Sequence, residues 1–246
     1  MNAIANNEFS RSLNLLRDLI PKPSAILCVS AHWLTRGTFV TNSSHPRMIY
    51  DMQGFPDELY ELKYPAPGAP DWAEKIKKTA SLTDINYDNG TWGFDHGTWG
   101  VLTHVYPAAD VPTLQLSLDM TKPASFHFQL GQQLAPLREE GLLILGSGNI
   151  VHNLRKILWL HDAPIFDWAL QYDQWVKTQL DQRNFSALIE AYDSTEIGRL
   201  SVPTPDHYFP LLYAIGASHG SDKLSYLLDQ MQNGSISMRS FMFYPV

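Results

Sequence analysis

Cysteine is almost absent from this chain. Cys28 is the single one among 246 residues, so no disulfide can form within the chain. This excludes the disulfide-stabilised class of small secreted domains and is typical of proteins from a reducing compartment. A basic surplus is also lacking, since 18 Lys and Arg against 25 Asp and Glu give a formal net charge of −7. We therefore expect neither nucleic acid nor an anionic membrane as a partner.

Long hydrophobic runs are missing as well. No stretch approaches the roughly 20 apolar residues that a membrane-spanning helix needs, and the N-terminus lacks the apolar segment of a signal peptide. We therefore expect a soluble, cytoplasmic protein. At 44% hydrophobic residues the chain can bury one large core, which predicts a single domain over residues 1–246.

Short apolar runs alternate with amphipathic segments along the chain. Buried strands are predicted at 25–30, 38–41, 112–118 and 142–145, and helices at 7–20, 57–62, 71–82, 126–137 and 166–180. A further helix is predicted to begin at Thr204-Pro205, and Ser235–Phe243 alternates like an edge strand. Residues 48–70 form a long loop, a kind that is often functional. This order predicts an α/β fold, with a central, mostly parallel sheet covered by helices on both faces.

Four histidines lie in turn-rich contexts of small residues: His32, His96, His152 and His207. His32 and His152 follow predicted buried strands, and the carboxyl ends of strands are where α/β folds build their sites. Neutral imidazole is also the commonest ligand for catalytic transition metals. A lone histidine of this kind more often caps strand carbonyls, but three similar contexts in one chain favour a metal site.

The neighbouring residues predict the local structure around His207 and His152. Thr204 is a suitable N-cap, which places His207 in the first helical turn, where the positive helix end keeps its ring neutral. His152 follows Gly146-Ser147-Gly148-Asn149, whose glycines let the backbone approach a ligand closely. Phosphate binding competes as an interpretation of that loop, which however lacks the lysine of a P-loop.

His96 differs from the other three and is predicted to lie on the substrate side. It stands on a glycine-bounded turn between Asp95 and Gly97, from which its ring can hydrogen-bond a phenolic oxygen. Asp95 either orients the ring or caps the helix that begins near Gly97, and capping is the favoured role. The remaining histidines lack such contexts and are interpreted as surface or core residues: His45, His104, His127, His161 and His219.

At these positions the sequence resembles the 4,5-DOPA extradiol dioxygenase family, within the class III extradiol ring-cleavage superfamily. The resemblance rests on five strings and spans nearly the whole chain: Val29–Trp33, Tyr64–Gly68, Trp92–Leu102, Gly146–Leu154 and Thr204–Leu211. It implies an enzyme that opens a catechol ring with O2 at a non-haem Fe(II), in a site that can also hold zinc. His32, His152 and His207 match the metal-site histidines. It also implies that His152 is an acid/base with a pKa near neutrality, and that His96 lies beside the substrate.

The resemblance has one departure. Family members begin with a strand leading into a Gly-His-Gly-Ser-Pro turn that supplies another metal ligand, whereas no histidine precedes His32 here. We expect that this N-terminal strand and turn are missing because the start is misplaced; real loss of the ligand is the alternative. The common two-histidine, one-carboxylate triad is not evident in the sequence, since Asp206 is assigned to the first turn of a helix.

Two other functions stay open at this point. A zinc-dependent hydrolase is one, because three histidines and a water are a familiar catalytic zinc set. A non-catalytic binding protein that kept the fold is the other, and the missing ligand histidine favours it.

Overall fold

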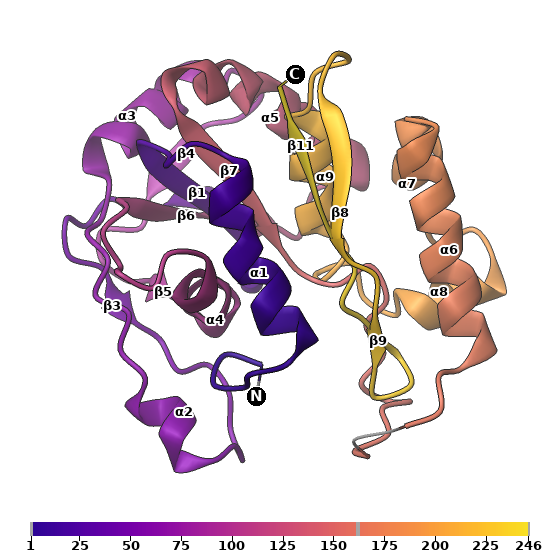
Figure 1. Ribbon diagram of the computed structural model, residues 1–246. Helices are drawn as coiled ribbons and strands as arrows, with labels where there is room; N and C mark the ends of the chain where they lie inside the picture. Colours follow the sequence, from indigo (N-terminus) through magenta and orange to yellow (C-terminus); the bar gives the residue numbers. More distant parts are fainter. Residues whose placement is uncertain (1, 161–162, 246) are drawn as a thin grey trace.

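Five strands form the central sheet of the computed structural model, which describes residues 2–160 and 163–245 (Figure 1). Their order is β4-β2-β6-β1-β7, with bounds β1 (Ala25–Thr35), β2 (Thr38–Val40), β4 (Ile85–Tyr87), β6 (Thr113–Asp119) and β7 (Leu142–Ser147). β1 pairs in parallel with both β6 and β7, β2 pairs in parallel with β4, and β2 with β6 is the antiparallel pair. The predicted mostly parallel sheet is confirmed.

Helices cover both faces of this sheet, as predicted. Their bounds are α1 (Glu8–Leu19), α2 (Asp57–Glu61), α3 (Pro70–Thr79), α4 (His96–Val105), α5 (Ala124–Leu134), a 3-10 helix (Ala135–Glu140), α6 (Asp167–Asp181), α7 (Phe185–Glu190), α8 (Glu196–Ser201) and α9 (Phe209–Gly216). Side chains alternate across β1: Leu27 and Val29 join the core under α3, α5 and α9, whereas Ile26 joins the core under α1 and α4. Both faces of the strand are therefore buried.

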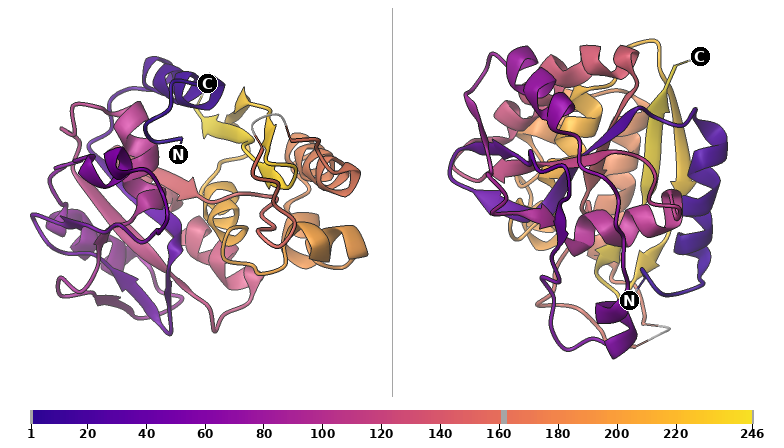
Figure 2. Two further views of the ribbon diagram at one scale, coloured as in Figure 1. Left: turned by 90° about the horizontal axis from the view of Figure 1, so that it is seen from below. Right: turned by 90° about the vertical axis from the view of Figure 1, so that its left-hand side faces the viewer.

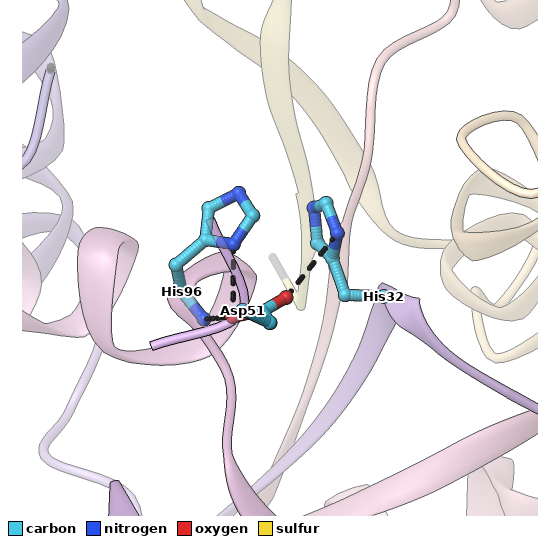
Figure 3. A group of neighbouring side chains, drawn as sticks. All are labelled: His32, Asp51 and His96. Carbon is cyan, nitrogen blue, oxygen red and sulfur yellow. Dashed lines mark hydrogen bonds and ion pairs between the residues drawn. The ribbon is translucent and has the colours of Figure 1, made fainter. Parts of the chain in front are cut away.

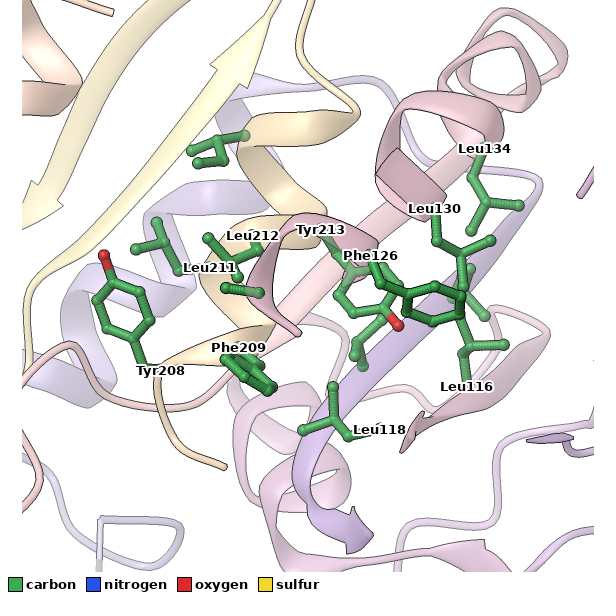
Figure 4. Close-up of a cluster of buried hydrophobic side chains, with 14 of the residues drawn as sticks. Leu116, Leu118, Phe126, Leu130, Leu134, Tyr208, Phe209, Leu211, Leu212 and Tyr213 are labelled. Atoms are coloured by element: carbon green, nitrogen blue, oxygen red, sulfur yellow. The ribbon is translucent and has the colours of Figure 1, made fainter. Parts of the chain in front are cut away.

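The larger core lies between the sheet and the α5–α9 pair. Figure 4 shows Phe126 and Leu130 of α5 meeting Tyr213 of α9 above Leu116 and Leu118 of β6. The two helices can approach closely because Gly131 has no side chain. A Cβ at this position would lie only 2.7 Å from the carbonyl oxygen of Tyr213. This contact fixes α9, and with it the turn that precedes α9, relative to the sheet.

The predicted C-terminal edge strand is present but interrupted at residues 238–239. The segment forms β10 (Ile236–Ser237) and β11 (Ser240–Tyr244), and β11 pairs antiparallel with β8 (Lys223–Leu228) in a separate ribbon. β10 pairs with β9 (Met231–Gln232), and the two views of Figure 2 show the β8–β11 ribbon beside α1. Alternation predicts a strand but carries no information about its partner, and here β8 is nearer along the chain than the central sheet.

Within the described ranges, no helix has both the length and the apolar character needed to cross a membrane.

The buried His127 of α5 generates a prediction about pH. Burial lowers its pKa to about 4, against a smaller opposing effect of Asp119, and its Nδ1 lies 3.1 Å from the Tyr213 hydroxyl. The unfolded chain binds a proton at this residue below about pH 6.5, whereas the folded chain does not until about pH 4. The free energy of unfolding should therefore fall as the pH drops from about 6.5 to about 4.

Urea unfolding of the wild-type chain and of His127→Gln at pH 7 and pH 4.5 measures this effect. The fall in unfolding free energy should be smaller in the variant, by up to about 3 kcal/mol, and unchanged in His45→Gln, whose side chain is exposed. An identical fall in the wild type and in His127→Gln would contradict the assignment.

Candidate functional site

One cavity of about 650 Å³ is lined by all four predicted histidines, His32, His96, His152 and His207. The ring centroids of His32 and His96 lie 3.9 Å apart, those of His32 and His207 5.2 Å, and those of His152 and His207 3.5 Å. The cavity continues from these rings between β7 and the β8–β11 ribbon. The sequence thus identified a real cluster, drawn from four separate parts of the chain.

His32 lies where β1 separates from one of its neighbours. β1 pairs with β7 as far as Ser30, whereas its pairing with β6 breaks off after Val29 and resumes at Leu34. The strand therefore continues to Thr35, past the end that the apolar run predicted. The irregular stretch between the two pairings carries His32, and such bulges re-aim side chains beside active sites.

His207 lies in the turn before α9 and not in a first helical turn. The backbone N–H of Phe209 donates to the carbonyl of Pro205 at 2.9 Å, but the regular ladder cannot start there. Pro210, the second residue of α9, has no N–H to donate. The prediction of a helix beginning at Thr204 is wrong for this reason.

Two glycines let the end of β7 pack directly against this turn. A Cβ on Gly148 would lie 2.3 Å from the carbonyl oxygen of His207, and one on Gly146 would lie 2.4 Å from that of Pro210. In the same contact, Nδ1 of His207 lies 3.1 Å from Oδ1 of Asn149. The glycines therefore serve a close approach to another backbone segment, whereas the sequence predicted an approach to a ligand, and they hold His207 against the loop that leads to His152.

Burial keeps three of the four rings neutral, those of His32, His152 and His207. It holds the pKa of His207 well below the ordinary value, with a further lowering from the neighbouring histidines, and it lowers the pKa of His152 to about 4. It also lowers the pKa of His32. The predicted neutrality of His207 is right, but its cause is desolvation and not a helix end. The expected near-neutral pKa of His152 is not found.

Asp51 is the site residue that the sequence did not reveal. Its Oδ1 lies 3.0 Å from Nδ1 of His96 and its Oδ2 lies 3.5 Å from Nδ1 of His32 (Figure 3). One donor atom from each of the three residues lies within 4.8 Å of the others. A two-histidine, one-carboxylate cluster is therefore present, contrary to the sequence-based expectation. The only signal was its place in the long loop 48–70, which does not single out one acidic residue.

Asp95 has the capping role that was favoured for it. Its side chain accepts a hydrogen bond from the backbone N–H of Thr98 at 3.0 Å, so that α4 begins at His96. Its other oxygen accepts from Nε2 of Gln115 at 2.7 Å. Because both carboxylate oxygens are used in this way, Asp51 and not Asp95 is the carboxylate beside the His96 ring.

The stacked pair places a condition on metal binding. The rings of His152 and His207 are parallel within 5°, and an ion bound by imidazole lies near the ring plane, at about 2.0–2.1 Å from the nitrogen. Because the two ring planes are parallel and about one ring thickness apart, one ion cannot lie in both of them. His152 and His207 can therefore bind the same ion only after one of the two rings has turned. Among the described residues, the set with convergent donor atoms is His32, Asp51 and His96.

The other histidines do not line the cavity: His45, His104, His127 and His219. His161 lies outside the described residues.

Gly148 generates a prediction. Gly148→Ala should push the His207 turn away from β7, because the added methyl overlaps a backbone oxygen that cannot rotate aside. We expect a loss of about 1–3 kcal/mol in unfolding free energy and a clear fall in affinity for divalent metal. Gly220→Ala is the matched control, since a Cβ there meets nothing within 4 Å. Urea unfolding and metal titration of both variants measure the two effects. Equal unfolding free energies and equal metal affinities for Gly148→Ala and Gly220→Ala would contradict the role of Gly148 in this close contact.

Comparison with known proteins identifies the family of the chain. Residues 5–241 match the family described as the catalytic LigB subunit of aromatic ring-opening dioxygenase. The chain is 44% identical to the 4,5-DOPA dioxygenase extradiol of Escherichia coli strain K12 over 243 residues, which covers 98% of this chain and 89% of that one. It is 36% identical to the Beta vulgaris protein of the same name, covering 90% of this chain and 83% of that one.

A solved structure gives the same result. The crystal structure of an uncharacterized protein from Escherichia coli K12 superposes with a TM-score of 0.84 at 40% identity, over 97% of this chain and 93% of that one. The resemblance drawn from the sequence is thereby confirmed, and the chain belongs to the LigB family as an extradiol, aromatic ring-opening dioxygenase.

Proposed function

We propose that this chain opens the ring of an L-DOPA-like catechol with O2, at a non-haem metal held by the histidines of the cavity. Fe(II) is the expected metal, and zinc can occupy the same ligands. The observation that carries the proposal is the convergence of His32, His96, His152 and His207 on one cavity. Relatives named 4,5-DOPA dioxygenase extradiol support the choice of substrate.

His32, His152 and His207 are the proposed metal ligands. Burial keeps all three neutral, which is the protonation state that ligation requires. Nδ1 of His207 lies 3.1 Å from Oδ1 of Asn149, the second-shell arrangement typical of metal-binding histidines. Its Nε2 lies 3.8 Å from Oδ2 of Asp206, beyond hydrogen-bond distance, and is the nitrogen proposed to bind the metal. A bound divalent metal would supply the Lewis-acid and redox chemistry that brings a catechol and O2 to reaction.

The remaining residues of the cavity bind and orient the substrate. Met52, Phe55 and Trp99 contribute apolar wall next to the histidines, which suits a flat aromatic ring and excludes water. His96 is placed to hydrogen-bond a phenolic oxygen. His152 is also the proposed acid/base, and because a ligating neutral imidazole has no lone pair left for a proton, it accepts a hydroxyl proton and returns it only while it is not bound to the metal. The low pKa of His152 makes it a weak base, so this role depends on a substrate hydroxyl that is itself acidified.

We propose that the enzyme works in the reducing cytoplasm. The single cysteine supports this: Cys28 is fully buried in β1, where burial raises the pKa of its thiol and keeps it from reacting.

Oxygen uptake tests the activity. The chain is loaded anaerobically with Fe(II) and given L-DOPA, and we expect uptake in equimolar ratio to substrate, with a yellow ring-opened product. Absence of uptake from a chain that retains zinc and hydrolyses esters would support the hydrolase instead. Absence of uptake together with failure to retain any metal would support the non-catalytic alternative.

His96 gives a sharper test of the site. His96→Gln should lower kcat by about 100-fold, the usual contribution of a positioned proton-transfer or hydrogen-bonding group, without abolishing metal binding. His45→Gln, outside the cavity, should leave kcat unchanged. Equal rates for the wild type and His96→Gln would remove His96 from the catalytic residues.

A further inference from the structure

A single carboxylate faces two histidines of the site. Asp51 lies below both rings in Figure 3, and the Nε2 atoms of His32 and His96 lie on the side away from it. Both contacts run to Nδ1, at 3.5 Å for His32 and 3.0 Å for His96. Nδ1 of His96 is buried and makes no aligned hydrogen bond among the described residues, and Asp51 is the carboxylate that lies 3.0 Å from it.

The backbone holds this carboxylate in place. The backbone N–H of His96 donates to Oδ1 of Asp51 at 2.9 Å. Two residues earlier, the backbone N–H of Ile49 donates to the carbonyl of Phe94 at 2.7 Å, and the indole N–H of Trp99 donates to the carbonyl of Ile49 at 3.0 Å. β3 (Arg47–Met48) also pairs with β5 (Gly93–Phe94). The loop that carries Asp51 is therefore fastened to the start of α4.

Asp51 acts as an acceptor in this position, since its Oδ1 accepts the backbone N–H of His96 at 2.9 Å while its two oxygens face Nδ1 of His96 and of His32. An ionised carboxylate accepts hydrogen bonds and donates none. A neutral imidazole next to it therefore places its one N–H on the nitrogen that faces the carboxylate.

We propose that Asp51 is a positioning residue that fixes His32 and His96 in the Nδ1–H tautomer, which presents Nε2 of His32 to the metal and Nε2 of His96 to a substrate hydroxyl. The assignment of the two Nε2 atoms rests on the proposed function, whereas the tautomers themselves do not. Carboxylates behind metal-binding histidines act in this way in other proteins. Here one carboxylate would serve a ligand and a substrate-side residue together.

The competing interpretation makes Asp51 a metal ligand with His32 and His96, and it demands the opposite tautomer. An ion among these three residues would take the Nδ1 lone pairs, so both rings would carry hydrogen on Nε2. The two interpretations therefore differ in a property of the metal-free chain.

Nitrogen NMR of the metal-free chain, labelled with 15N-histidine and held at pH 8, reads the tautomers directly. The ring signals are assigned by their loss in His32→Gln and His96→Gln. We expect Nδ1–H for both residues in the wild type. In Asp51→Asn an amide N–H replaces one acceptor oxygen, so at least one ring should adopt the Nε2–H form. Asp57→Asn, in the exposed first turn of α2, is the control that should leave both unchanged.

Nε2–H forms in the wild type, or tautomers unchanged in Asp51→Asn, would overturn the proposal. Metal titration provides a second measurement: Asp51→Asn should weaken metal affinity by about 10–100-fold, as loss of a second-shell partner does, and should lower kcat more than it changes KM. The NMR measurement needs neither metal nor catechol, so its result does not depend on whether oxygen uptake is observed. Failure of the proposed dioxygenase function can therefore be distinguished from failure of the proposed role of Asp51.

Discussion

The unequal pairing of β1 is the constraint on which the site depends. β1 separates from β7 after Ser30, while it pairs again with β6 at Leu34. The segment between these points is free to turn His32 toward the space beyond the end of β7. The chain that leaves β7 passes through Gly148 and Asn149 to reach the same space. α4 reaches it from the face of the sheet opposite to the one that α9 covers. Four distant segments meet there because the sheet opens at one point.

Close approach and desolvation then determine the chemistry of the cluster. Gly146 and Gly148 lie against backbone oxygens, and Gly97 lies against the side chains of Ser30 and His32, so that the rings come within a few ångströms of one another. Four imidazoles at this separation cannot all be charged, and burial keeps three of them neutral. Asp51 is the carboxylate that contacts the rings of His32 and His96. The result is a set of neutral nitrogen donors, which suits a transition metal and a catechol.

Sequence reasoning recovered what depends on local pattern. The β1 run, the amphipathic helices and the glycine-flanked histidines each carry a signature within a few residues, and these gave the fold and all four cavity histidines. It did not reach what depends on distant contacts. Alternation predicted an edge strand near the C-terminus but not its partner, which is β8. Asp51 becomes a site residue only because β3 and β5 pair and bring its loop to α4. The turn at His207 was misassigned although its cause, the missing N–H of Pro210, was in the sequence.

The most direct test of this account is a crystal structure of the chain loaded with Fe(II) or cobalt, with the ion located by anomalous scattering. The account predicts an ion bound to Nε2 of His32 together with ring nitrogens of His207 and His152, one of their rings having turned out of the stacked arrangement. Asp51 should remain on Nδ1 of His32, behind the ion. An ion held between Asp51, His32 and His96 on their Nδ1 atoms would contradict it.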